Sequence, residues 1–358
     1  MSVASSFRNA TVAHMSTFLP LVAVSVAFLL GLLLIVAVGV PVGEAVEAFV
    51  DGAWGSSYSI STSINRSIIL GLVGLGFILA HRANLTNVGG EGQIAIGGIV
   101  ATAACLHGAA HLPGQLAYVI PMIFAALAGG IWGGIAGVLR VRFGTNEVIS
   151  TLLLSFIGVW MLYGSVQSVN LLRRPMTDSA TLPESLEIPE NTRIPFLFEE
   201  SGSTLHFGLL IALALCLIVA VVMTKSTFGT KLLAVGLNPI AARRAGMPIN
   251  HYLVFSMFLA GAMGGLAGSF MLQADQQVLK AAFSSGYGFD GLVVGLLARG
   301  TVKGVIAAAL LLGFLRSAGI NMELTAGVPS AIVLIIQGLI IVTLAGTAYW
   351  LSTLRKAD

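Results

Sequence analysis

Residues 81–98 read HRANLTNVGGEGQIAIGG, and this stretch decides how the rest of the chain must fold. It lies between two apolar runs, yet it holds a carboxylate at Glu91, an amide at Gln93 and five glycines. A charged group beside hydrocarbon is costly, so it should face protein or water. Glycines let backbones come close or let a helix break, and the freed N–H and C=O groups then need polar partners. The stretch therefore predicts a polar, protein-lined break among packed helices.

The composition places the chain in a membrane. Of its 358 residues, 56% are apolar and 9% are charged, whereas about 25% are charged in a soluble domain. The 43 glycines suit membrane helices in close backbone contact. Cys105 and Cys216 both lie in apolar runs, which is typical of small buried side chains and indicates neither a disulfide framework nor a metal site.

The apolar runs predict ten membrane spans, since a spanning helix needs about 20 apolar residues. The second and eighth are short, and glycine interrupts the third, seventh and eighth. The expected fold is an all-α, polytopic helix bundle that forms a single transmembrane domain over residues 1–358. The spans are expected at about 18–40, 64–80, 91–110, 116–139, 146–170, 206–224, 251–273, 287–298, 304–320 and 330–350.

The charges predict an orientation, because Lys and Arg accumulate in cytoplasmic segments. With a cytoplasmic N-terminus, the inner segments hold 12 of the 18 basic residues: Arg8, Arg82, Arg140, Arg142, Lys225, Lys231, Arg243, Arg244, Arg299, Lys303, Arg355 and Lys356. The outer segments hold 11 of the 15 acidic ones: Glu44, Glu47, Asp51, Asp178, Glu184, Glu187, Glu190, Glu199, Glu200, Asp275 and Glu323. An odd number of spans would break this alternation, so both termini are expected in the cytoplasm.

Two connections between spans are long. The outer one, about 171–205, is rich in proline and acid and predicts an ordered extracytoplasmic flap or short helix. The inner one, 225–250, is basic and contains AVGLNPIAARRAGM. Asn238 followed by Pro239 is typical of an N-cap and the first position of a helix, and Gly246 should end that helix. Gly236 and Gly246 are expected to bound this docking helix, which would fit a cleft on a cytoplasmic partner. The residues expected to make this contact are Gly236, Asn238, Pro239, Ala241, Ala242, Arg243, Arg244 and Gly246. The alternative is a basic anchor that touches only lipid headgroups.

Motifs for chemistry on bound substrates are missing from the sequence. It contains no G-x-x-x-x-G-K-[ST] phosphate loop and no H-E-x-x-H metal motif, and its Ser and His residues show no nucleophile spacing. We therefore expect no catalytic residue, no metal, no cofactor and no nucleic-acid partner.

Four segments in order resemble one family. They are NVGGEGQIAIGG at 87–98, GTNEVISTLLLSFI at 144–157, GTKLLAVGLNPIAARRAGM at 229–247 and GYGFDGLVVGLLARG at 286–300. They resemble the conserved elements of ABC importer permeases of the branched-chain amino acid, ribose and nucleoside superfamily, most closely the nucleoside type. Val88-Gly89-Gly90 and Ser155-Phe156 depart from the family pattern, as does the ARGTVKG segment that follows span eight. These departures put the substrate in doubt more than the family.

The resemblance implies a fold and a set of partners. Spans two to five and seven to ten would form inverted-topology halves, with a substrate site at their interface. The chain would sit in the bacterial plasma (inner) membrane and pair with a second, unlike permease. A lipid-anchored or periplasmic binding protein would deliver the solute, and two separate ATPase subunits would grip the docking helices. Nucleosides are the first expected substrate and a pentose or related simple sugar the second.

The expected substrate pathway combines polar and aromatic side chains at the interrupted helices. Glu91 could instead cap a helix N-terminus or pair with Arg82, and Phe156 and Phe289 could pack against other apolar side chains without contacting substrate. Asn146 and Glu147 are expected to cap the fifth span and to gate its cytoplasmic end. The pathway candidates are Glu91, Gln93, Ser155, Phe156, Phe289 and Asp290.

Two readings outside the ABC class remain. In an ion-coupled secondary transporter, Glu91 and Asp290 would bind the coupling ion, but the 225–250 docking helix would have no purpose. A membrane scaffold would not need acids flanked by glycines.

Overall fold

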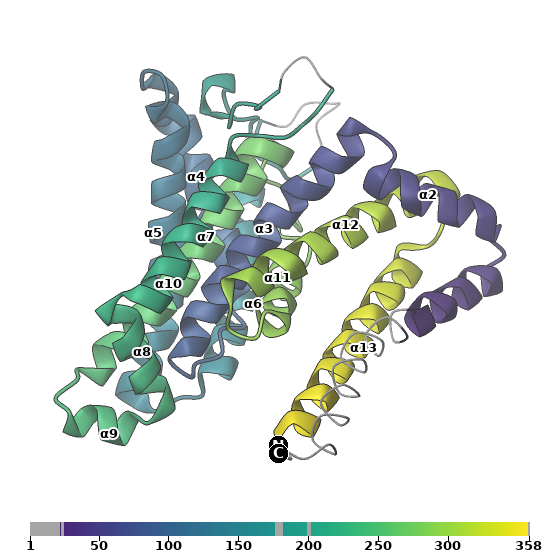
Figure 1. Ribbon diagram of the computed structural model, residues 1–358. Helices are drawn as coiled ribbons and strands as arrows, with labels where there is room; N and C mark the ends of the chain where they lie inside the picture. The colour runs from purple at the N-terminus through teal and green to yellow at the C-terminus, as the bar shows by residue number, and fades with distance from the viewer. Residues whose placement is uncertain (1–21, 23–24, 176–181, 199–201, 357–358) are drawn as a thin grey trace, which may run out of the picture. The chain divides into compact units, whose positions relative to one another are not determined.

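The computed structural model describes residues 22, 25–175, 182–198 and 202–356 (Figure 1). Within these ranges the regular structure is helical, with β-bridges only between isolated residue pairs. The predicted all-α membrane bundle is thus confirmed. The longer helices are α2 (Val42–Trp54), α3 (Ser57–Arg82), α4 (Gly90–His107), α5 (Leu116–Phe143), α6 (Glu147–Gln167), α7 (Gly208–Lys225), α8 (Thr227–Leu237), α9 (Pro239–Arg244), α10 (Ile249–Phe270), α11 (Tyr287–Leu297), α12 (Val302–Ala326) and α13 (Ser330–Lys356).

Every predicted span coincides with a helix, although residues 18–21, 23 and 24 of the first lie outside the described residues. Six helices in the described part are long and apolar enough to cross a membrane: Ser57–Arg82, Leu116–Phe143, Glu147–Gln167, Gly208–Lys225, Ile249–Gln276 and Val302–Ala326. Shorter apolar helices lie at Ser25–Ala37, Thr227–Leu237, Tyr287–Leu297 and Ser330–Thr343. The count of ten crossings stays a prediction, because several spans are short or polar.

Three helical segments escaped the sequence analysis. The first, α2, lies in the acidic outer segment, and the second, α8, lies in the basic inner one. The helix α3 starts at Ser57, well before the predicted start at 64. There the Ser61 hydroxyl donates to the carbonyl oxygen of Ser57 over 2.7 Å. The serines at the start of α3 lower its hydropathy, although their hydroxyls can bond within the helix, so the hydropathy pattern placed the start too late.

The described residues form two compact units, and the boundaries between them fall inside α3 and α12. One contains the residues up to Ser63 and from Phe314 onward, and the other contains Ile64–Gly313. Whether the chain acts as one transmembrane domain stays a prediction.

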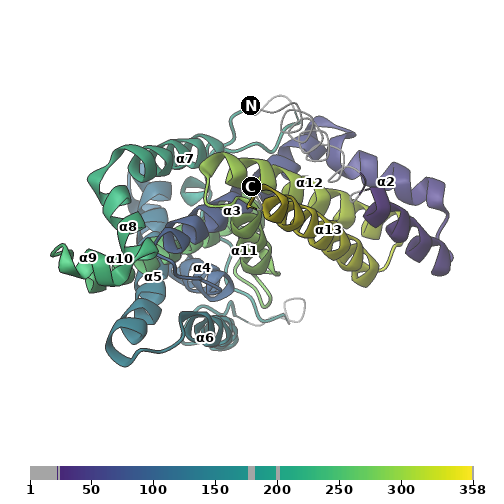
Figure 2. The same ribbon diagram turned by 60° about the horizontal axis from the view of Figure 1, so that its bottom comes forward.

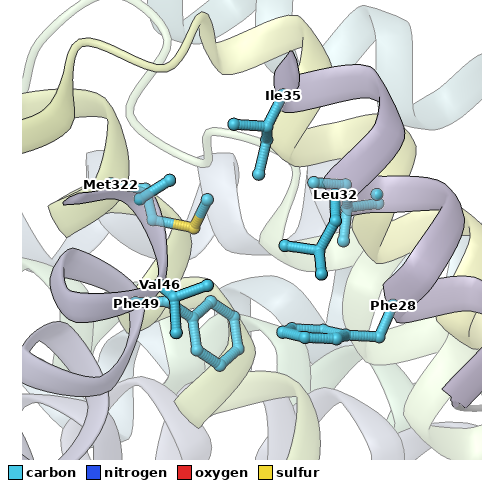
Figure 3. Close-up of a pocket in the computed structure, with 9 residues that line it drawn as sticks. Phe28, Leu32, Ile35, Val46, Phe49 and Met322 are labelled. Carbon is cyan, nitrogen blue, oxygen red and sulfur yellow. The ribbon is translucent and has the colours of Figure 1, made fainter. Parts of the chain in front are cut away.

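The first unit is held by small and branched apolar side chains. Figure 3 shows Phe28, Phe49 and Met322 around a cavity of about 20 Å³. That volume would hold about one water, but the apolar lining keeps it dry. The Asn321 amide donates to the carbonyl oxygen of Ala48 over 2.7 Å and ties α12 to α2. The buried core consists of Ala27, Ile35, Ala45, Ala48, Met322, Val328, Ile332, Ile336 and Ile340.

The second unit is built around α4, which contacts α5, α6, α10 and α11 (Figure 2). Most of α4 is buried, from Gly90 through Gly98 without a gap. A helix buried on all sides needs neighbours that come close all round it. Glycines provide this, as at Gly97, where an added Cβ would collide with the backbone of Gly265 on α10.

The crossing of α5 and α10 is also made by glycines. A Cβ added to Gly129 on α5 would lie 2.5 Å from the carbonyl oxygen of Gly261 and 2.6 Å from the Cα of Gly265. One added to Gly133 would lie 2.5 Å from the carbonyl oxygen of Met257. These atoms belong to backbone and cannot yield, so the two helices would have to separate.

Replacing Gly129 with alanine should therefore destabilise the protein. We expect a loss of about 2 kcal/mol, because overpacking a close crossing typically costs that much. The measurement is the thermal unfolding midpoint of the purified protein in detergent. Gly164→Ala on α6 is the matched control, since its Cβ would meet no atom within 4 Å. Equal midpoints for the two variants would contradict the glycine crossing.

Candidate functional site

The N-termini of α4 and α11 meet through glycine backbone. The carbonyl oxygen of Gly288 on α11 lies 2.8 Å from the position of a Cβ on Gly90 of α4. A Cβ on Gly288 would collide with the backbone of Gly90 and Glu91. We call residues 89–93 and 286–290 together the α4–α11 junction. Both helices start inside the unit at this point, so their free N–H groups need acceptors there.

Glu91 supplies one of these acceptors. Its side chain is 5% exposed, and its Oε1 accepts a hydrogen bond from the backbone N–H of Gly288 over 2.9 Å. Glu91 also lies in the first turn of its own helix. An anion is stabilised at a helix N-terminus, and here one carboxylate lies at two of them. The capping alternative for Glu91 is thus confirmed, and the helix it caps across the junction is α11.

Arg82, the other predicted partner of Glu91, has its guanidinium at the turn between α7 and α8. Its Nη2 donates to the carbonyl oxygen of Met223 over 2.7 Å, and its Nε donates to that of Gly229 over 3.2 Å. Arg82 therefore satisfies one backbone carbonyl near the C-terminus of α7, where positive charge is favourable, and a second in the first turn of α8.

Gln93 forms a reciprocal amide pair with Asn87. Asn87 Nδ2 donates to Gln93 Oε1 and Gln93 Nε2 donates to Asn87 Oδ1, each over 3.1 Å. Asn87 Oδ1 also accepts from the backbone N–H of Gly89 over 2.9 Å. The pair is buried and closes the loop that leads into α4. Sequence analysis missed Asn87, although its amide two residues before the glycine pair was the available signal.

Ser155 of α6 joins the same cluster. Its hydroxyl lies 3.4 Å from both the N–H of Gly92 and the carbonyl oxygen of Val88, and it is buried. Phe156, the next residue, is 55% exposed, so the two side chains lie in different environments. Successive helical residues point about 100° apart, which explains the difference.

At the start of α11, Phe289 is 42% exposed and Asp290 is half-buried in the first turn. The structure thus brings Glu91, Gln93 and Ser155 together with the beginning of α11. Phe156 lies outside this cluster. Contact of any of these side chains with substrate stays a prediction.

The start of α6 is capped as predicted. Asn146 Oδ1 accepts from the N–H of Val148 over 2.9 Å, and Glu147 lies 3.5 Å from Arg140 across the turn. The Arg140 guanidinium also donates to the carbonyl oxygen of Thr145. The capping role of Asn146 is confirmed, and the gating role of the pair stays a prediction.

The predicted inner helix is present as α9. Asn238 Oδ1 accepts from the N–H of Ala241 over 3.0 Å, and Pro239 opens the helix. Gly246 follows the helix with φ +78°, a conformation that suits glycine. Gly236 does not bound the helix as predicted. It lies inside α8, where a Cβ would collide with the carbonyl oxygen of Arg82.

Most of α9 is exposed, and the helix packs on its neighbours through the small side chain of Ala242. Ala242 is buried against Val235 and Ile249. Ile240 is 67% exposed, and the neighbouring Leu237 is 76% exposed. Arg243 and Arg244 are exposed as well. In Figure 1, α9 lies at the far end of α8 and α10, so this mixed apolar and basic surface extends beyond the helices around it.

The outer connection, residues 168–207, is fastened to the end of α10. A π-helical turn, Met271–Gln276, extends that helix. Backbone hydrogen bonds join Ser185 to Leu279 (2.8 Å) and Ile188 to Gln277 (3.0 Å). The buried Gln273 donates to the carbonyl oxygens of Thr192 (2.6 Å) and Tyr118 (3.1 Å). The expectation of an ordered connection holds for its described residues. Sequence analysis missed Gln273, although a glutamine at the end of an apolar span was a signal for a buried hydrogen-bonding residue.

A groove of about 560 Å³ lies between the C-terminal halves of α4 and α6. Its volume suits a small molecule, and His107 and Asn170 are among its polar residues. Most of the lining is apolar, which matches poorly the many hydrogen-bonding groups of a sugar or a base. The lining residues are Ile99, Ala103, His107, Met161, Gly164, Ser165, Asn170, Leu171 and Leu172.

The family described as "Branched-chain amino acid transport system / permease component" matches residues 59–345. The chain belongs to this family. The match covers both the α4–α11 junction and α9. The predicted recognition is therefore confirmed, and the protein is a multi-pass membrane permease that acts as a transport component.

Three relatives are similar along most of their length. The Guanosine ABC transporter permease protein NupP of Bacillus subtilis is 35% identical over 338 residues, 92% of each chain. The Glucose ABC transporter permease protein TsgB13 of Haloferax volcanii is 33% identical over 345 residues, 92% of the permease and 87% of that protein. The Nucleoside ABC transporter permease protein NupB of Lactococcus lactis is 32% identical over 332 residues, 91% and 90% respectively. The permease is thus related over almost its whole length to ABC transporter permeases.

His206 joins the outer connection to α7. Its Nδ1 accepts from the N–H of Gly208 over 3.1 Å, and its ring meets that of Phe270 edge-on at 6.1 Å. Burial lowers the pKa of His206 from 6.5 to about 4, because the charged ring would lose its hydration. A protonated ring would also lose the Nδ1 lone pair that accepts this bond.

The permease should accordingly lose stability in acid through His206. Between pH 6.5 and about 4 the unfolded chain binds this proton and the folded chain does not, so stability falls as the pH falls. The full effect is about 3 kcal/mol below pH 4. The measurement compares unfolding midpoints from pH 8 to 4 with those of His206→Asn, which keeps an acceptor oxygen but does not titrate. Identical pH profiles would refute this role.

Proposed function

We propose that the permease imports nucleosides as one membrane subunit of an ATP-driven importer in a bacterial plasma membrane. The observation that carries the proposal is the 35% identity with a permease named for guanosine, over 92% of the chain. The 32% identity with a permease named for nucleosides supports the same class. Both termini would lie in the cytoplasm, in keeping with the basic inner and acidic outer segments.

The α9 surface would be the contact for an ABC ATPase subunit. Its exposed isoleucine and leucine can enter an apolar cleft, and its two arginines can pair with acids at the rim. The hydrogen-bonded N-cap at Asn238 and the buried Ala242 hold this surface in place. ATP hydrolysis by the partner would shift the bundle between outward-open and inward-open states, because the ATPase would bind one state better than the other. The permease itself would break no bond.

A second, unlike permease would complete the transmembrane part. Bacillus subtilis has a further guanosine ABC transporter permease protein, NupQ, which is 25% identical to this chain over 257 residues, 70% of the chain and 77% of NupQ. Two similar proteins named for one substrate in one organism favour a heterodimer, with one α9-type contact per permease. An extracytoplasmic binding protein would dock on the outer connection and deliver the solute.

A simple sugar is the second candidate cargo. TsgB13, named for glucose, is 33% identical to this chain, between the 35% of NupP and the 32% of NupB. A nucleoside contains a pentose, so a site with sugar-binding groups could serve either class. Recognition of the base would distinguish a nucleoside permease from a sugar permease.

Uptake by cells that express the complete transporter should separate these cargoes. We expect saturable uptake of radiolabelled guanosine, competed by excess adenosine and not by excess glucose or ribose. Uptake should stop when the ATPase subunit is deleted, since the chain has no phosphate-binding loop of its own. Competition by glucose or ribose would favour the sugar candidate. Uptake that continues without the ATPase and collapses with a protonophore would favour a secondary transporter.

Charge reversal on α9 tests the ATPase contact. Arg243→Glu should reduce co-purification of the ATPase and uptake by about tenfold or more, as expected when one charge pair at an interface becomes repulsive. Folding should be unaffected because the side chain is exposed. The control is Lys303→Glu, an equal charge change at an exposed residue in the first turn of α12. Normal ATPase recovery and uptake with Arg243→Glu would refute the contact.

A further inference from the structure

The hydrogen bond from Gly288 to Glu91 joins residues 197 positions apart, on two different interrupted helices. The contacts of α11 with α3 include close apolar ones. A Cβ on Gly291 would lie 2.6 Å from a methyl group of Val73, and one on Gly74 would lie 2.6 Å from a methyl group of Val294. Apolar contacts are non-directional, so they specify the position of a helix less sharply than a hydrogen bond does. A directional bond to a buried carboxylate fixes the position of α11 along α4.

The chain that leads into α11 is strained. Gln277, Ala282 and Ser285 have φ values of +58°, +58° and +43°, which residues other than glycine rarely adopt. Such strain persists only where surrounding contacts hold it, and it concentrates at functional and switching elements. Ser185 and Ile188 of the outer connection hold the start of this segment, and the α4–α11 junction holds its end.

The carboxylate of Glu91 is poorly placed to bind a solute. The residue is 5% exposed, and its Oε1 is occupied by the N–H of Gly288. A substrate ligand must present its polar atoms to an open space, whereas this one lies where two helix N-termini converge. The negative charge of a carboxylate is favourable at the N-termini of both α4 and α11.

We propose that Glu91 is a positioning residue: it fixes the start of α11 against α4 and thereby controls the rate of the conformational step in transport. This rests on the proposed transport function. Conformational steps set the turnover of many proteins, so loss of this bond should lower kcat and leave substrate recognition unchanged.

The first test measures kcat and KM for guanosine uptake by the complete transporter in proteoliposomes. Glu91→Ala should lower kcat about tenfold or more, since a bond to a charged group is lost, with KM within about twofold of the wild type. Glu91→Gln keeps an acceptor oxygen and should recover part of kcat, also at unchanged KM. Glu44→Ala is the control, because Glu44 also lies in the first turn of its helix, α2, but is exposed.

The second test does not depend on the cargo. Hydrogen–deuterium exchange of the peptide 284–292 in the purified transporter reports the Gly288 amide directly. Exchange should be faster in Glu91→Ala, intermediate in Glu91→Gln and unchanged in Glu44→Ala. If Glu91→Ala does not fold, the Gln variant carries both measurements.

The outcomes separate the two proposals. A higher KM at unchanged kcat, with wild-type exchange at 284–292, would make Glu91 a substrate ligand and overturn the positioning role. Faster exchange with wild-type kcat would overturn its control of the rate. If the wild-type transporter moves no guanosine, the cargo proposal fails. Exchange at 284–292 would then still decide whether Glu91 holds α11.

Discussion

The structure depends on one constraint: backbone groups freed at helix ends must find partners where water is scarce. Two helices, α4 and α11, begin inside the second unit, and their N-termini meet. Glycine backbones at Gly90 and Gly288 allow the approach, and the Glu91 carboxylate accepts one of the freed N–H groups. The asparagine and glutamine pair before α4 closes the adjoining loop. The Glu91 carboxylate would be costly in hydrocarbon, but here the N–H group freed at the start of α11 stabilises it.

Ordered contacts extend from this junction along the chain. The strained segment before α11 is bonded to the outer connection, and Gln273 ties that connection to α5. A separate set of contacts lies at the end of α3, where Arg82 donates to carbonyl oxygens of α7 and of α8, the helix that leads into α9. Contacts of this kind give a bundle discrete arrangements, and transport requires at least two that ligand and ATPase can bias differently.

Family membership and cargo rest on different evidence. The family match extends from residue 59 to 345 and reflects features that any such permease needs, such as close helix crossings and a capped α9. The relatives named for guanosine and for glucose differ by only two percentage points in identity to this chain. A fold hosts several substrates, since specificity lies in a few side chains of the site.

The sequence by itself determined the helical membrane class, the positions of most spans, the capped inner helix and the family, because hydropathy, N-cap residues and motifs are local signals. It missed α2 and α8, which at 13 and 11 residues are shorter than the membrane spans that the hydropathy search sought, and it expected Gly236 outside any helix. It singled out Glu91, Gln93 and Ser155 but could not tell what they touch. Only the tertiary structure decided that Glu91 caps α11, that Arg82 bonds to α7 and α8, and that Asn87 pairs with Gln93. The reason is physical: the partners come from distant segments, and packing alone brings them together.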